Sequence, residues 1–108
     1  FDPASPLYAD FDAMLASCQR LVTAARGAGI PVIFTNVTYA RDGRDGGVFY
    51  RKLPALKVFE RGNPLAEFLP SLRPAADDLV ITKHYASAFF GTALASSLTA
   101  MRVDTLLI

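Results

Sequence analysis

Cysteine and histidine are almost missing from this 108-residue sequence, which contains one of each, Cys18 and His84. A single cysteine excludes an internal disulfide framework. It is compatible with a reducing compartment, and we expect a cytoplasmic protein. A metal site needs several converging ligands, and no group of histidine, cysteine and aspartate with ligand spacing is present. The glycines between Gly43 and Gly47 match no phosphate-binding fingerprint. We therefore expect no metal and no cofactor.

Long apolar runs and an excess of charge are also lacking. No apolar run approaches the roughly 20 residues that a membrane-spanning helix needs, so no membrane partner is expected. The 11 lysines and arginines nearly balance the 10 aspartates and glutamates, for a net charge of +1. Without a strongly basic tract, the composition does not suggest a nucleic-acid partner.

Helical and β-rich segments alternate along the chain. Residues from Asp10 onward predict a helix with one buried face, which Gly27 and Gly29 should end. The apolar positions of that face are Phe11, Met14, Leu15, Cys18, Leu21, Val22 and Ala25. The other expected elements are strands at 32–39, 79–83 and 103–108, helices at 64–69 and 92–101, and an irregular loop over 40–63.

This order predicts an α/β fold with three layers, a mostly parallel sheet and helices on both faces. The apolar part of 79–83 is continuous, which suggests that this strand is buried on both faces. Both ends look cut, so we expect a fold that is incomplete at both ends. A further strand should precede the first helix and others should follow Ile108, because unpaired sheet edges are unfavourable.

Ligands of open parallel sheets bind at the carboxyl ends of the strands, where Thr38-Tyr39 and Lys83-His84-Tyr85 lie in this sequence. Burial can lower the pKa of a lysine at such a place, or the lysine can hold a carboxylate. On pattern alone, the favoured explanation is a solvated strand end for Lys83 and a structural hydrogen-bonding residue for His84.

Two further features have an ordinary explanation beside a functional one. Cys18 lies on the apolar stripe of the first expected helix, where free cysteine is usually a small core residue. The stretch 41–62 carries six basic and three acidic residues, a net +3. The functional explanation is a rim that attracts an anionic substrate, but the sequence alone favours an ordinary solvated loop.

The segment from Lys83 to Leu94, Lys-His-Tyr-Ala-Ser-Ala-Phe-Phe-Gly-Thr-Ala-Leu, resembles the lysine motif of the isochorismatase-like cysteine hydrolases. The segments 2–8, 34–49 and 57–65 resemble the N-carbamoylsarcosine amidohydrolase branch of that family. The resemblance covers nearly the whole chain. It implies the Rossmann-like fold of the family, with residues 1–108 as the central part of one hydrolase domain.

The resemblance also implies a catalytic triad of Asp, Lys and Cys, of which only Lys83 is carried over. The family aspartate precedes the segment 2–8, and Asp2 lies too far along to replace it. The family cysteine follows the strand that begins near Thr105, and Cys18 matches nothing catalytic. The implied reaction is attack of a thiolate on a carboxamide or ureido carbonyl.

The implied partners are a small-molecule amide or ureido substrate that carries a carboxylate, and further copies of the chain in a homo-oligomer. The zinc-binding relatives have an Asp-x-His pattern after the second strand. The equivalent Asn36-Val37-Thr38 departs from that pattern.

Three alternatives remain open. A maleamate-type amidase shares much of the pattern. A truncated, non-catalytic relative could instead serve as an oligomer partner, with an apolar contact surface formed by Phe49, Tyr50, Leu53, Val58 and Phe59. A small flavodoxin-like nucleotide-binding module is disfavoured, because no phosphate-binding loop is visible at a helix N-terminus.

Overall fold

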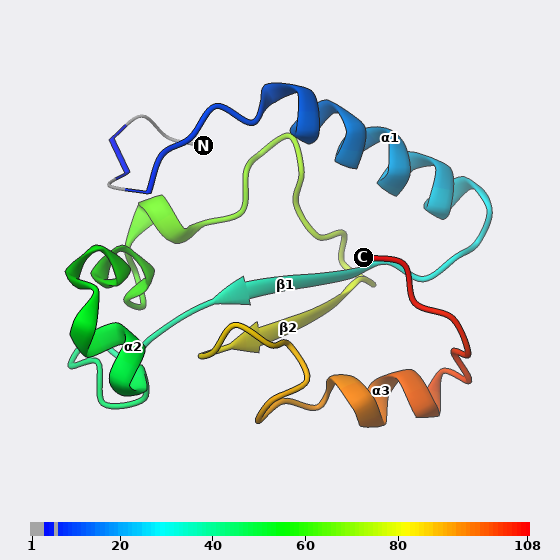
Figure 1. Cartoon of the computed structure of the whole chain (residues 1–108). Coiled ribbons are helices and arrows are strands. Elements are labelled where there is room, and N and C mark those ends of the chain that lie inside the picture. Colours follow the sequence, from blue (N-terminus) through cyan, green and yellow to red (C-terminus); the bar gives the residue numbers. More distant parts are fainter. Residues whose placement is uncertain (1–3, 6) are drawn as a thin grey trace.

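A parallel pair of strands forms the centre of the chain in the computed structural model, which describes residues 4, 5 and 7–108 (Figure 1). Strand β1 (Ile33–Val37) pairs with β2 (Leu79–Lys83) from Ile33 opposite Leu79 to Val37 opposite Lys83. Figure 1 shows helices α1 (Asp12–Gly27) and α3 (Leu94–Ala100) on opposite sides of this pair. The expected α/β fold with a parallel sheet and helices on both faces is confirmed.

Helix α1 ends where the glycines predict. Its last residue is Gly27, and Gly29 follows with a left-handed φ of 69°. The N–H group of Ile30 donates to the carbonyl of Ala25 at 2.9 Å, which closes the last turn. Because a residue without a Cβ adopts positive φ at little cost, Gly29 lets the chain turn directly into β1.

The apolar face of α1 is less buried than predicted. Among the described residues of this helix none is buried. Leu15, Cys18, Val22 and Ala25 are half-buried, whereas Met14 is 48% and Leu21 68% exposed. The periodicity correctly predicted the helix. Burial also requires a neighbouring surface, and the described residues pack against only part of the apolar stripe.

The expected irregular loop over 40–63 contains regular structure. Helix α2 (Gly47–Lys52) and the 3₁₀ helix η1 (Pro54–Phe59) lie within it, beyond the arrowhead of β1 in Figure 1. Both are too short for sequence periodicity to reveal. This segment also carries much of the buried core, in which Tyr39, Tyr50 and Leu56 pack together.

The backbone of Tyr39 holds this segment against the end of β1. The N–H group of Tyr39 donates to Phe59 O at 2.8 Å, and the N–H group of Arg61 donates to Tyr39 O at 2.9 Å. The two bonds close the segment into a loop whose ends meet at the carboxyl end of β1. The predicted strand 32–39 is correspondingly shorter, because Tyr39 bridges to Glu60 instead of continuing the ladder.

The remaining helices are also shorter than expected. The predicted helix 64–69 is a 3₁₀ turn, η2 (Pro64–Ala66), capped as predicted by Asn63, whose Oδ1 accepts from Leu65 N at 3.0 Å. The predicted helix 92–101 is α3, with Leu94 buried on its inner side. Residues 103–108 form no strand, since a strand requires a paired neighbour and the described residues supply none there.

Strand β2 has the predicted bounds, but its predicted burial on both faces is wrong. Ile81 is 5% exposed, whereas Val80 is 38% exposed and Thr82 is also exposed. One face of the strand therefore packs and the other is open over the described residues. No helix in the described part of the chain is long and apolar enough to cross a membrane.

Candidate active site

Lys83 is the last residue of β2 and lies level with Val37, the last residue of β1. The N–H group of Thr38, the residue directly after β1, donates to Lys83 O at 3.3 Å, so the backbone of Lys83 is held by the neighbouring segment. Its side chain is half-buried, and Nζ donates to Ala86 O at 2.8 Å. Lys83 therefore lies at the edge where parallel sheets bind ligands.

His84 links this edge to the segment that follows β1. Its Nε2 lies 3.0 Å from Oδ2 of Asp45, and the two side chains are 35% and 32% exposed. The other carboxylate oxygen of Asp45 accepts from Ala40 N at 2.8 Å. The predicted role of His84 as a hydrogen-bonding residue is confirmed, and its partner is a carboxylate that sequence reasoning did not identify.

Several groups act on the Asp45 carboxyl. Burial acts to raise its pKa, but the N–H groups of Ala40 and of Asp45 itself, together with His84, outweigh burial and hold the pKa below its ordinary value. Asp45 is accordingly a fixed negative charge at neutral pH. It serves as an acceptor for both the loop backbone and the His84 ring.

Two tyrosines pack beside the hydrogen bond between His84 and Asp45. Tyr39 is 3% exposed, and its ring makes edge-on contacts with the rings of Tyr50 and His84, with centroids 4.9 Å and 6.4 Å away. The Tyr50 hydroxyl donates to Glu60 Oε1, and this hydrogen bond raises the pKa of Tyr50 to about 12. Burial, followed by the charge of Asp45, raises the pKa of Tyr39. Both tyrosines are therefore neutral packing residues at physiological pH.

The basic and acidic side chains of the stretch 41–62 differ in their exposure to solvent. The six basic side chains are all exposed: Arg41, Arg44, Arg51, Lys52, Lys57 and Arg61. Of the three acidic side chains, Asp45 and Glu60 are half-buried and bonded to His84 and Tyr50, and only Asp42 is exposed. The loop therefore presents more positive charge outward than its net +3 suggests, and both the rim and the ordinary solvated loop are compatible with this exposure.

The stretch equivalent to the zinc-binding pattern carries an amide instead of a carboxylate. Asn36 Oδ1 is buried and accepts no hydrogen bond from the described residues. Within the described part of the chain, no three His, Cys, Asp or Glu side chains converge as metal ligands. Asn36 and Thr38 therefore give no structural reason to place zinc at this edge.

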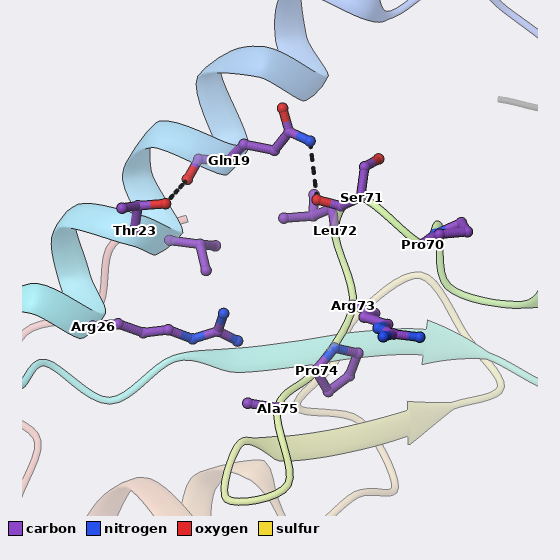
Figure 2. A pocket seen from close by; sticks show the side chains of 10 residues that line it. Gln19, Thr23, Arg26, Pro70, Ser71, Leu72, Arg73, Pro74 and Ala75 are labelled. Atoms are coloured by element: carbon purple, nitrogen blue, oxygen red, sulfur yellow. Dashed lines mark hydrogen bonds between the residues drawn. The ribbon is translucent and has the colours of Figure 1, made fainter.

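A separate hollow of about 490 Å³ lies between α1 and the segment 70–75 (Figure 2). Figure 2 shows Gln19, Thr23 and Arg26 of α1 on one side of it, and Gln19 Nε2 donates to Ser71 O at 2.9 Å. Neither Lys83 nor His84 lines this hollow. Its lining residues come from α1, which precedes β1, and from 70–75, which precede β2. We therefore place the candidate site at the carboxyl ends of the strands instead.

The predicted roles of two other features differ in outcome. Cys18 is half-buried on α1 and lies outside the cluster around Lys83, as expected for a structural residue. The expected apolar contact surface is only partly exposed: Phe49 is 63% and Leu53 37% exposed. Tyr50 and Val58 are core residues, so they are not available for a contact surface. Of the segment 2–8, residues 2, 3 and 6 lie outside the described residues.

The sequence is similar to a protein family and to two characterised amidohydrolases. The sequence profile described as the isochorismatase domain matches residues 2–108. A maleamate amidohydrolase from Pseudomonas putida is 43% identical over 108 residues, covering 98% of this chain and 51% of that protein. An N-carbamoylsarcosine amidase from an Arthrobacter species is 36% identical over 102 residues, covering 90% of this chain and 38% of that protein.

The fold is shared with solved structures at similar coverage. A cysteine hydrolase from Pseudomonas syringae superposes with a TM-score of 0.88 and 31% sequence identity, covering 96% of this chain and 50% of the other. The chain thus spans about half the length or less of these three proteins.

Proposed function

This chain belongs to the isochorismatase family, and on that premise we propose that it is part of a cysteine-dependent amidohydrolase. The proposed reaction cleaves the C–N bond of a small amide that carries a carboxylate. The observation that carries the proposal is the position of Lys83, fixed by its strand at the edge where parallel sheets bind ligands. The proposed full-length protein, which contains these 108 residues, supplies the aspartate and the cysteine from outside them.

In the proposed reaction, the aspartate takes the proton of the cysteine thiol, and the thiolate attacks the amide carbonyl carbon to form a tetrahedral intermediate. The C–N bond then breaks, ammonia leaves with a proton delivered by the aspartic acid, and an acyl-thioester remains. Water hydrolyses the thioester and regenerates the thiol. The ammonium group of Lys83 favours the ionised forms of the aspartate and the cysteine by its positive charge.

The charge of the loop supports a substrate with a carboxylate. Its basic side chains face outward, while Asp45 and Glu60 face inward, so the exposed surface attracts anions. Identity is higher to the maleamate amidohydrolase, at 43%, than to the N-carbamoylsarcosine amidase, at 36%. We therefore place maleamate first and an N-carbamoyl amino acid second, the reverse of the order suggested by the sequence motifs.

The test is ammonia release by the purified full-length protein from maleamate, from N-carbamoylsarcosine and from a neutral amide such as acrylamide. We expect the highest kcat/KM for maleamate and the lowest for the neutral amide. Preference for N-carbamoylsarcosine would select the second candidate. Absence of release from all three, by a protein that is folded by circular dichroism, would overturn the proposal.

A non-catalytic role as an oligomer partner predicts the same fold without turnover, so the same assay distinguishes it. We also propose that the full-length protein is a homo-oligomer, because Val48 and Phe49 are 56% and 63% exposed on α2. Sedimentation of wild type and Phe49→Ser tests this proposal. A monomeric wild type would contradict it, and a lower association constant in the variant would place the contact on α2.

A further inference from the structure

We propose that His84 is a positioning residue for the substrate, acting through its hydrogen bond to Asp45. This inference rests on the proposed function, since it concerns how the loop that follows β1 meets a substrate near Lys83. The loop turn 40–47 and the end of β2 are far apart in the sequence, with His84 and Asp45 separated by 39 positions. Their bond links the two segments through side chains.

The geometry makes Asp45 a junction of two contacts. One carboxylate oxygen accepts from Ala40 N at 2.8 Å, and the other lies 3.0 Å from His84 Nε2. The turn is thereby closed on itself and attached to the residue next to Lys83. Hydrogen bonds to an ionised carboxylate are among the stronger ones in proteins, so loss of the imidazole should release the turn.

A second contact reaches the same pair of segments. A Cβ atom placed on Gly47, at the start of α2, would lie 3.2 Å from Cε1 of Tyr85. His84 therefore bonds to the turn, and the ring of Tyr85 lies close to the start of the helix that follows it. Lys83 itself depends less on the loop, because β1 holds its backbone through the ladder and through the Thr38 N–H group.

Because β1 holds Lys83 while His84 holds the turn, loss of His84 should affect substrate binding more than the chemical step. The turn carries Arg41 and Arg44, which are exposed on the loop that we propose to attract the substrate carboxylate. Releasing the turn lets these side chains spread over more positions, so binding weakens while the chemistry at Lys83 changes less. We expect His84→Ala to raise KM for the anionic substrate about five- to tenfold, with kcat within about twofold of wild type.

Three matched variants sharpen the test. His84→Gln retains an N–H donor near the position of Nε2 and should restore most of the lost KM. Asp45→Ala should raise KM by a similar factor. The double variant His84→Ala/Asp45→Ala should be no worse than the poorer single variant, because both substitutions remove the same link.

Hydrogen exchange separates this inference from the proposed function, because it requires no turnover. In the full-length protein, His84→Ala should speed exchange of the Ala40 amide, whose acceptor is Asp45, while the amides of β1 and β2 remain protected. An inactive wild type with this exchange pattern would overturn the proposed function and retain the link. An active wild type in which His84→Ala leaves KM unchanged, lowers only kcat, or is not rescued by His84→Gln would overturn the positioning role.

Discussion

The ring of Tyr50 lies across Gly43 so closely that a Cβ atom on Gly43 would come within 2.1 Å of Tyr50 Cε1. Gly46 is covered by the same side chain, at 2.4 Å from its Cβ. The turn that carries Asp45 therefore packs its backbone directly on an aromatic ring. Glycine is required at these positions for space, and Gly43 also has a left-handed φ of 63°.

Gly43→Ala should destabilise the full-length protein by about 3 kcal/mol, the sum of left-handed strain and overpacking. Gly29→Ala is the matched control for strain, since its φ is 69° and nothing lies within 4 Å of an added Cβ. It should cost only about 1 kcal/mol. Urea unfolding of both variants measures the difference, and equal losses would contradict the close packing of Tyr50 on Gly43.

Tyr50→Phe should remove a pH-dependent part of the stability. The bond to Glu60 raises the folded-state pKa of Tyr50 to about 12, above the ordinary value of about 10. A raised pKa means that the contribution is complete below about pH 10 and is lost as the pH rises toward 12. The wild type should therefore melt at a higher temperature than Tyr50→Phe at pH 8, and the difference should shrink above pH 10. A constant difference from pH 8 to 12 would contradict this account.

Asp78→Asn should weaken the connection between α1 and β2. Asp78 Oδ2 accepts from Ala75 N at 2.8 Å and pairs with Arg26, and its side chain is 12% exposed. The Ala75 N–H group lowers the Asp78 pKa, burial opposes this, and Arg26 lowers it further. Because the folded-state pKa is lowered, the contribution is complete above about pH 4 and is lost as the pH falls below that value.

At pH 7 we expect Asp78→Asn to cost about 1 kcal/mol, and we expect the difference from wild type to be smaller at pH 3. The neighbouring exposed carboxylate allows a control, Asp77→Asn, which should change the free energy of unfolding little. Urea unfolding at pH 7 and pH 3 provides the comparison. A loss that is equal at both pH values would show that the carboxylate charge is not involved.

Much of the fold was predictable because alternation of helical and β-rich segments is a local property of the sequence. The bounds of β2 and the position of Lys83 at its end followed from a short apolar run and the residue after it. The end of α1 followed from Gly27 and Gly29. These features depend on neighbouring residues, and the sequence pattern carries that information directly.

The position of Asp45 in the candidate site was not predictable, because it depends on a contact between residues far apart in the sequence. Asp45 lies in a glycine-rich stretch with no periodicity, and only the folded chain brings it to His84. The one available signal was Tyr39, a large aromatic residue at the end of the predicted strand 32–39, where its ring can pack beside the sheet edge. Burial was similarly misjudged for α1 and β2, since periodicity predicts which face is apolar without predicting what covers it.

Steady-state turnover of Lys83→Ala in the full-length protein tests the central claim most directly. Arg73→Ala serves as the control, because Arg73 is an exposed cation that lines the hollow beside α1 and lies outside the proposed site. If Lys83 is the catalytic lysine, kcat/KM for the preferred amide should fall at least about 1,000-fold in Lys83→Ala and stay near the wild-type value in Arg73→Ala, with both variants folded. A folded Lys83→Ala variant that retains wild-type turnover would contradict the assignment of the active site to the carboxyl ends of β1 and β2.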